Sequence, residues 1–232
     1  MKKILFFVLA LFVVSSLFAQ GVKIGVKAGV NMAGMSDVEV SVMGHSMTVL
    51  KNDGMSIGYH GGVFANISFS DFIGFQPELL FSMQGGKYKL NGLSSGIIDI
   101  DVGDILNIES VKINCQFGYI NLPLLLEIKP VANLGILVGP QVGYNVIRKA
   151  TASIEGIKET ISGSEFDDIF PDFKKIDVGA TIGVQYTFAE HLQVGARYYL
   201  GLIDALDVTE GGLGNYKGLK SNVFQLSLGY VF

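Results

Sequence analysis

The sequence predicts an all-β fold, an eight-stranded antiparallel up-and-down transmembrane β-barrel. Three observations lead to it. Apolar residues recur at every second position in eight segments, and the connections between these segments alternate between long and short. Mean hydropathy is +0.44, although no segment beyond the first twenty residues holds the roughly 18 consecutive apolar residues of a membrane helix. The chain is therefore expected to cross a membrane with strands.

Composition excludes several other classes. The 49% share of hydrophobic residues and 16% share of charged residues exclude a disordered chain. The chain has 30 glycines but only 5 prolines, and the glycines follow no three-residue period, which excludes collagen.

Residues 1–20 have the pattern of a secretory signal peptide. Lys2 and Lys3 precede an apolar stretch from Ile4 to Leu17, and small residues suitable for cleavage follow. We expect the cut after Ala19 or Gln20, which leaves residues 21–232 as one outer-membrane β-barrel domain. An uncleaved anchor helix is the alternative, but the segment is short for a span. Removal of both lysines lowers the formal net charge from −4 to −6.

The first four strands are expected at residues 22–32, 56–69, 75–84 and 120–129. In the first, Val22, Ile24, Val26, Ala28, Val30 and Met32 share one face, and lysine, glycine and asparagine alternate on the other. Such alternation indicates a strand with one apolar and one polar face. Phe64 is an exception on the polar face of the second strand.

The last four strands are expected at residues 134–146, 176–188, 192–202 and 224–232. Each alternates apolar residues with glycine, glutamine, threonine or charged residues. A length of about ten residues suits a tilted strand that crosses a bilayer.

The connections predict the orientation. Those at 70–71, 130–133 and 189–191 are short, whereas those near 33–55, 87–116, 149–173 and 203–219 are long. Short periplasmic turns and long extracellular loops are typical of barrels in the outer membrane of Gram-negative bacteria. An even number of strands lets the sheet close on itself, and eight strands leave a lumen that side chains fill.

Three prolines conflict with a regular ladder. Pro77, Pro123 and Pro140 fall inside consecutive strands, where each removes a hydrogen-bond donor. We therefore expect one shared irregularity, a bulge. Alternation at residues 98–102 and 111–117 also predicts that strands three and four extend beyond the membrane as a hairpin. Tyrosines and phenylalanines near strand ends, Tyr119 among them, are expected to form the interfacial aromatic belts.

Six motifs in order give a family resemblance. They are Gly25 to Asn31, Gln76 to Ser82, Asn121 to Leu124, Gly139-Pro140 with Gly143-Tyr144, Asp177 to Gly179, and Gln225 to Phe232. Together they resemble the PorT-like outer-membrane β-barrel family. The resemblance implies an eight-stranded barrel of the OmpA/OmpX type with recurrent strand prolines. Some members of that family support protein secretion, but no motif here marks that subgroup.

Charged residues on the inner face form the candidate site. Lys27, Glu78 and Arg197 are expected at one height, and Lys23, Glu127 and Lys129 in a lower tier. Asp177 and Gln225 lie on the same polar face. Buried charges require partners, so these eight residues predict a structural network that fills the lumen. A proton path, an ion path or a gated pore is the functional alternative.

Other chemistry has weaker support. A single cysteine, Cys115, and three histidines do not form a clustered metal site, and no cofactor is expected. Acidic loop residues lack the spacing of a complete calcium loop. His45, Ser46 and an aspartate are residue types found in catalytic sites, but their spacing matches no catalytic motif. We therefore expect no enzymatic activity. The acidic loop residues are Asp99, Asp101, Asp104, Glu165, Asp167, Asp168 and Asp172, and the candidate aspartates are Asp37 and Asp53.

The carboxyl terminus resembles an assembly signal. Leu228, Tyr230 and Phe232 share a face and end on an aromatic residue, the pattern by which barrel-assembly machinery recognises its clients. The alternative is an ordinary last lipid-facing strand.

The sequence therefore predicts a non-enzymatic membrane scaffold with extracellular loops for adhesion or partner binding. An accessory role in protein secretion is the alternative, followed by a small pore or a loop-based enzyme. The expected partners are outer-membrane lipid, the assembly machinery and an extracellular or secretion-system protein. We expect a monomer and no nucleic-acid partner, because acidic loops lack the basic patch that nucleic acid needs.

Overall fold

The computed structural model describes residues 22–42, 45–90, 93–94, 99–100, 111–154, 157–211 and 214–232. The predicted signal peptide lies outside these residues. The described elements are β1 (Val22–Met35), β2 (Val38–Val42), β3 (His45–Ser68), β4 (Ile73–Leu90), β5 (Leu93–Ser94), β6 (Asp99–Ile100), β7 (Val111–Val131), β8 (Leu134–Ile154), β9 (Ile157–Ser162), α3 (Ser164–Ile169), β10 (Ile176–Phe188), β11 (Leu192–Gly201), β12 (Leu206–Gly211), β13 (Gly214–Gly218) and β14 (Ser221–Val231).

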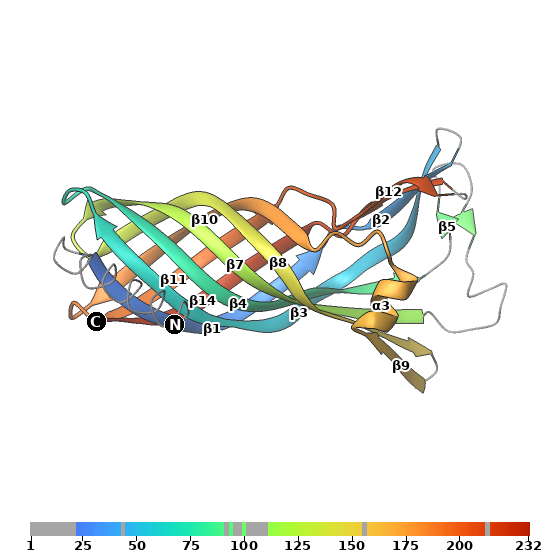
Figure 1. The fold of residues 1–232 in the computed structure, drawn as a ribbon, viewed down its shortest axis with the longest axis horizontal. Helices are drawn as coiled ribbons and strands as arrows, with labels where there is room; N and C mark the ends of the chain where they lie inside the picture. Colours follow the sequence, from blue (N-terminus) through green and yellow to red (C-terminus); the bar gives the residue numbers. More distant parts are fainter. Residues whose placement is uncertain are drawn as a thin grey trace, which may run out of the picture.

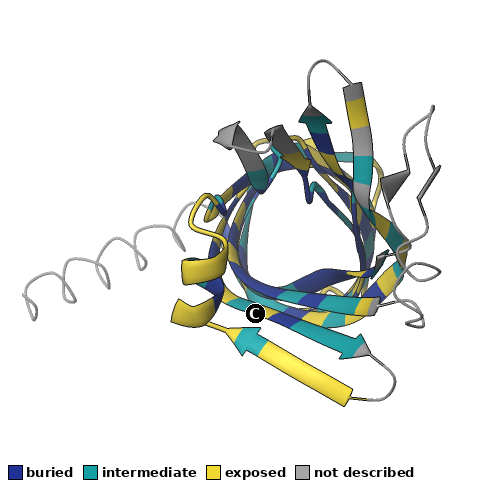
Figure 2. Cartoon of the chain, turned by 90° about the vertical axis from the view of Figure 1, so that its right-hand side faces the viewer, coloured by how far each residue is buried: buried dark blue, intermediate teal, exposed yellow. Residues whose placement is uncertain are grey.

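Eight of these strands close into an antiparallel barrel, as predicted. Their order around the wall is β1, β14, β11, β10, β8, β7, β4 and β3, and β3 pairs with β1 to complete the ring. Val26 on β1, for example, lies opposite Tyr230 on β14 and Val63 on β3. Figure 1 shows the barrel from the side, and Figure 2 shows the ring of strands along its axis.

The two faces of the wall differ as the alternation predicts. Exposed apolar side chains cover the outside, such as Val63, Leu122 and Ile182. Polar side chains on the inside are fully buried, and Asn31, Gln76 and Ser82 each have 0% exposure. This arrangement suits a wall with lipid outside and packed polar groups inside.

Large apolar residues also fill the lumen. Phe64, Leu80, Leu125 and Leu137 lie on the polar faces of their strands and are at most 2% exposed. Tyr119 belongs with them at 1% exposure, so its predicted place in an aromatic belt is wrong. It follows Gly118 on β7 and has the parity of the inward-facing Asn121, which the belt assignment overlooked.

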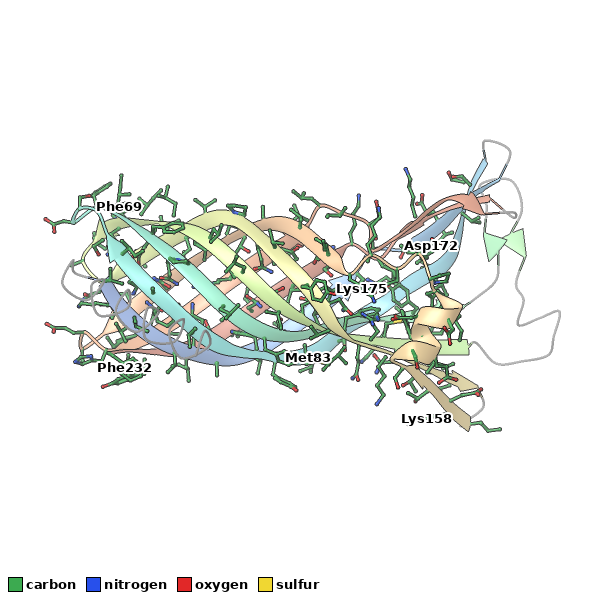
Figure 3. All side chains as sticks on the ribbon, in the orientation of Figure 1. Phe69, Met83, Lys158, Asp172, Lys175 and Phe232 are labelled. Atoms are coloured by element: carbon green, nitrogen blue, oxygen red, sulfur yellow. The ribbon has the colours of Figure 1, made fainter. Side chains whose placement is uncertain are left out.

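One end of the barrel carries short turns, at residues 69–72, 132–133 and 189–191. We call it the short-turn end and the opposite end the long-loop end. Figure 3 places Phe69 and Phe232 at the short-turn end and Lys158 at the other.

The strands continue far past the predicted boundaries at the long-loop end. The β4–β7 ladder runs to Leu90 opposite Val111, which confirms the predicted hairpin extension for residues 111–117. Of the predicted segment 98–102, only Asp99 and Ile100 are described, and they pair with β5 instead. β9 pairs with the end of β8, and the start of β3 joins a small second sheet with β2, β13 and β12. The segments expected as long connections therefore contain much additional strand.

The ladder is interrupted beside Pro77 and Pro123, but the predicted bulge is wrong. In the β4–β7 ladder, Pro77 lies opposite Leu124 and Leu80 lies opposite Asn121, so the register is the same on both sides of the intervening positions. The β8–β10 ladder runs continuously through Pro140, which lies opposite Ala180. The wall absorbs each missing donor without an inserted residue.

The described residues contain no helix long and apolar enough to span a membrane.

Candidate functional site in the barrel lumen

Glu78 forms the centre of the lumen. Its Oε1 lies 2.8 Å from Lys27 Nζ, and its Oε2 accepts a hydrogen bond of 2.7 Å from Arg197 Nη1. The three side chains are between 0% and 3% exposed. The carboxylate thus has a cation on each oxygen, which is the geometry that a buried charge requires.

Two glutamines extend these contacts towards the short-turn end. Gln76 donates to Glu78 Oε1 at 2.5 Å, and Gln185 donates to Gln76 at 2.8 Å and to Glu127 Oε1 at 2.7 Å. Lys129 lies 3.3 Å from the other oxygen of Glu127. We call Lys27, Gln76, Glu78, Glu127, Lys129, Gln185 and Arg197 the lumen network.

Glycines provide the space for these large side chains. A Cβ atom on Gly183 would lie 2.5 Å from Arg197 Cγ, and one on Gly135 would lie 2.6 Å from Glu127 Oε1. A Cβ on Gly25 would overlap the ring of Phe64, which lies 4.6 Å from Lys27 Nζ. The high glycine content of the inner face is therefore matched to bulky residues on neighbouring strands.

A second polar layer lies further along β1. Asn31 donates to Ser82 Oγ at 2.9 Å and to the Met83 carbonyl at 2.8 Å, while its oxygen faces His60 Nδ1 at 2.7 Å. Gln225 donates to the same oxygen at 3.2 Å. Gln225, one of the eight predicted lumen residues, thus belongs to this layer and not to the contacts around Glu78.

The remaining predicted lumen residues lie at the two ends. Lys23 is exposed and lines a cavity of about 350 Å³ at the short-turn end, together with Glu127, Lys129 and Glu190. Asp177 is 7% exposed near the start of β10, at the opposite end. The structure therefore brings together five of the eight predicted residues in the lumen network: Lys27, Glu78, Glu127, Lys129 and Arg197.

An aromatic cluster fills the long-loop end. Phe117 points inward from β7 with 0% exposure and stacks on Phe173 at 5.1 Å. Phe166 on α3 meets both rings edge-on, at 6.0 Å from Phe117 and 5.5 Å from Phe173. Tyr88, which is 1% exposed, belongs to the same apolar core. We call Tyr88, Phe117, Phe166 and Phe173 the aromatic cluster.

An ion pair anchors the segment that supplies two of these rings. Arg148 near the end of β8 contacts both carboxylate oxygens of Asp167 on α3, at 2.7 Å and 3.0 Å. Lys175 lies 3.5 Å from the same carboxylate. Figure 2 shows α3 at the rim of the ring, where this ion pair holds it. Asp167, expected as a solvated acidic residue, is thus a structural anchor.

The predicted catalytic residue types have other partners. Asp37 accepts a hydrogen bond of 2.7 Å from the Asn52 amide, and Asp53 lies 3.1 Å from Lys89 Nζ. Ser46 Oγ lies 2.8 Å from Ser41 Oγ. Within the described ranges, no three His, Cys, Asp or Glu side chains form a group that could hold a metal. Asp101 and Asp104 lie outside those ranges, and the His45 and Asp99 side chains are not described.

The predicted assembly residues lie on the outside of the last strand. Leu228, Tyr230 and Phe232 are between 46% and 64% exposed, and the rings of Tyr230 and Phe232 are 5.4 Å apart. The Phe232 amide donates to Ile24 on β1 at 2.8 Å. The terminal residue thus contributes to the junction between the first and last strands.

Alternation predicts that Asn31, His60, Gln76 and Gln185 lie on the polar faces of their strands but does not identify their partners. Their contacts depend on which strands lie across the lumen. The aromatic cluster was missed altogether, because α3 has no strand alternation. A run of phenylalanines at 166, 170 and 173 in a long connection was the available signal.

Several solved structures of outer-membrane proteins are similar to this chain at low sequence identity. The chain resembles a major outer membrane protein from Thermus thermophilus, with a TM-score of 0.47 and 14% identity over 91% of this chain and 99% of that one. It also resembles Neisserial surface protein A, with a TM-score of 0.45 and 12% identity over 90% and 97%. For the attachment invasion locus protein Ail of Yersinia pestis, the values are 0.38 and 14% over 90% and 98%. No curated protein sequence shows a significant match.

A family model decides the assignment. The model for the outer membrane protein beta-barrel domain matches residues 18–207, which is most of the chain. Strand number, antiparallel closure and the apolar outer face are those of this class. The chain therefore belongs to the outer membrane protein beta-barrel domain family and resides in the bacterial outer membrane.

Proposed function

We propose that this protein is a non-enzymatic scaffold with a closed lumen, which holds a β-sheet extension outside the cell for adhesion or partner binding. The observation that carries the proposal is the burial of the Glu78 ion pairs, whose side chains are at most 3% exposed. The aromatic cluster fills a second level nearer the long-loop end. With eight strands, side chains are enough to fill the interior, so a continuous aqueous path is not expected.

The long-loop end provides the surface for a partner. Bacterial barrels generally place their long loops outside the cell, so this end is assigned to the exterior. There the second sheet follows the order β3, β2, β13 and β12, so that β12 is the edge among the described strands, bridged to Phe173 at Leu206. An edge strand has unpaired backbone groups that can bind an added strand. In Figure 1 this sheet extends well past α3.

The partner would distinguish adhesion from secretion. An accessory role in secretion, which some members of the PorT-like family have, requires a partner in the same cell. Adhesion requires a partner outside the cell. Pore and enzyme functions receive less support, because the lumen residues and the candidate aspartates already have partners.

Co-purification from native membranes tests this proposal. The tagged full chain is compared with a variant in which residues 206–218, the β12–β13 hairpin, are replaced by a short Gly/Ser linker. We expect a protein that co-purifies with the full chain to be lost from the variant, while both forms keep the heat-modifiable gel migration of a folded barrel. Retention of the same partners by the variant would refute binding at this sheet.

A further inference from the structure

A row of lysines crosses the outer surface at the long-loop end. Lys51 on β3 lies opposite Lys89 on β4, and Lys89 lies opposite Lys112 on β7. Lys112 is paired with Ser153 on β8, which is itself opposite Lys158 on β9. The pairing therefore places four lysines along one line of paired residues that crosses five strands.

Two more lysines lie directly beneath this row. Lys87 is opposite Asn114, two positions nearer the membrane on β4 and β7. Lys149 is opposite Gln116 on β7. We call Lys51, Lys87, Lys89, Lys112, Lys149 and Lys158 the lysine patch. Four of them line a hollow of about 390 Å³, with Asn114, Gln116, Thr151 and Ser153 and with one carboxylate, that of Asp53.

The patch is a concentration of positive charge on an acidic protein, and only one of its six lysines is paired with a carboxylate among the described residues. The chain as a whole has a net charge of −4. Among the described residues, only Lys89 of the patch forms an ion pair, at 3.1 Å from Asp53. Like charges directly opposite each other destabilise a sheet, so an apposed row of lysines is unfavourable unless an anion binds there.

Its height corresponds to the membrane surface. On β8 the exposed apolar Ile147 precedes Lys149 by two residues. The patch then extends four residues to the level of Ser153, about 10 Å along the barrel axis for a strand rise near 3.3 Å and a tilt near 40°. Lysine side chains can also reach back towards the interface. The ammonium groups thus lie at and just above the headgroups.

We propose that the lysine patch binds the phosphate groups of a phosphorylated glycolipid headgroup in the outer leaflet of the outer membrane. Lysine binds phosphate as a point charge, and the hydroxyl and amide groups of the hollow can bind sugar hydroxyls. A saccharide headgroup has the depth to contact both levels of the patch. Lipid recognition by clustered lysines next to a membrane segment follows the same electrostatics elsewhere.

The test measures lipid retention by the full barrel in neutral detergent, using native mass spectrometry with titrated lipid A. The test variant is Lys87→Gln/Lys112→Gln/Lys149→Gln. The control variant is Lys175→Gln/Lys217→Gln/Lys220→Gln, which removes the same charge at the same end. Lys175 and Lys220 each lie 3.5 Å from an aspartate, and Lys217 lies opposite Glu39. These exposed pairs contribute little to folding, so the control variant should fold.

We expect the test variant to bind bisphosphorylated lipid A on the order of 100-fold more weakly than the native chain, since each lysine at an anionic surface contributes roughly fivefold. The control variant should bind within about threefold of the native chain, and dephosphorylated lipid A should bind weakly to all forms. Equal binding of lipid A with and without phosphate, or equal losses in both variants, would overturn the proposal. Patch-dependent binding of a sulfated oligosaccharide in preference to lipid A would also overturn it, in favour of a soluble polyanion.

Discussion

Arg197 on β11 donates a hydrogen bond of 2.7 Å to Glu78 on β4, and these two strands lie four places apart in either direction around the eight-strand ring. The pair therefore joins opposite walls of the barrel. Lys27 on β1 binds the other oxygen of the same carboxylate at 2.8 Å. One glutamate thus connects three strands through the middle of the lumen.

Removing this glutamate should strongly destabilise the barrel. In Glu78→Ala, Lys27 and Arg197 remain buried without a counter-ion, and breaking a buried pair in this way costs about 3–5 kcal/mol. Urea unfolding in detergent, followed by the loss of heat-modifiable migration, measures the difference. The apolar triple variant Lys27→Met/Glu78→Leu/Arg197→Met should be less destabilised, because no charge is left unpaired. A triple variant less stable than Glu78→Ala would contradict this explanation.

Gly183→Ala should disturb the same contact indirectly. Its new Cβ would lie 2.5 Å from Arg197 Cγ and 2.6 Å from the Ala196 carbonyl oxygen, so both the arginine and the β11 backbone must shift, at a cost of about 1–3 kcal/mol. Gly61→Ala is the control, because the nearest atoms to its Cβ are at 3.6 Å and 3.9 Å. Urea midpoints of the two variants provide the comparison. Equal midpoints would show that Arg197 is not held by this glycine.

Cys115 should resist alkylation in the folded protein. It lies on β7 beyond the lipid-facing part of the strand, and burial raises the pKa of its thiol to about 12. At pH 8 only about one thiol in 10,000 is then the reactive thiolate. Mass spectrometry should find no iodoacetamide adduct on the native barrel and complete labelling in urea. Rapid labelling of the native protein would contradict the burial of this residue.

The raised pKa of Cys115 makes the stability of the folded protein depend on pH. An ordinary thiol has a pKa near 9.0, so between pH 9 and pH 12 the unfolded chain loses this proton and the folded chain retains it. The contribution is fully present below pH 9 and declines as pH rises through that window. Cys115→Ala should flatten this part of the stability profile, measured by urea midpoints at each pH.

Deleting Phe232 should reduce insertion into the outer membrane more than synthesis. The residue is 64% exposed and pairs through its backbone with Ile24 at the closing seam. Phe188→Ala is the control, because Phe188 is 48% exposed at the same short-turn end but lies on β10, away from the seam between β14 and β1. Quantitative blots of membrane and total fractions test both. Equal effects would show that Phe232 acts only as an interfacial aromatic residue.

Alternation was enough to predict the eight wall strands, because a strand between lipid and a packed lumen must change polarity at every position. It also placed Lys27, Glu78 and Arg197 on the inner face at one height. It did not reveal that Glu78 and Arg197 lie on opposite walls, since that depends on closure of the ring. The lysine patch depends on register in the same way, because Lys51, Lys89 and Lys112 are far apart in sequence.

Two expectations failed for local reasons. The predicted bulge is absent at the strand prolines. The sheet keeps the same register on both sides of Pro77, so no extra residue is inserted. Tyr119 was assigned to an interfacial belt from its position near a strand end, although its parity placed it inside. The second sheet and α3 lie within segments expected as loops, where short strands and a six-residue helix leave little periodic signal.

Ionic conductance in planar bilayers tests the closed lumen most directly. The native barrel should insert without opening stable channels, because the lumen network and the aromatic cluster fill the interior at two levels. The variant Glu78→Ala/Phe117→Ala, which opens both levels, should show discrete conductance steps if it is inserted from folded protein. Native barrels that conduct steadily, with steps that change in Glu78→Ala alone, would contradict a scaffold and indicate a pore.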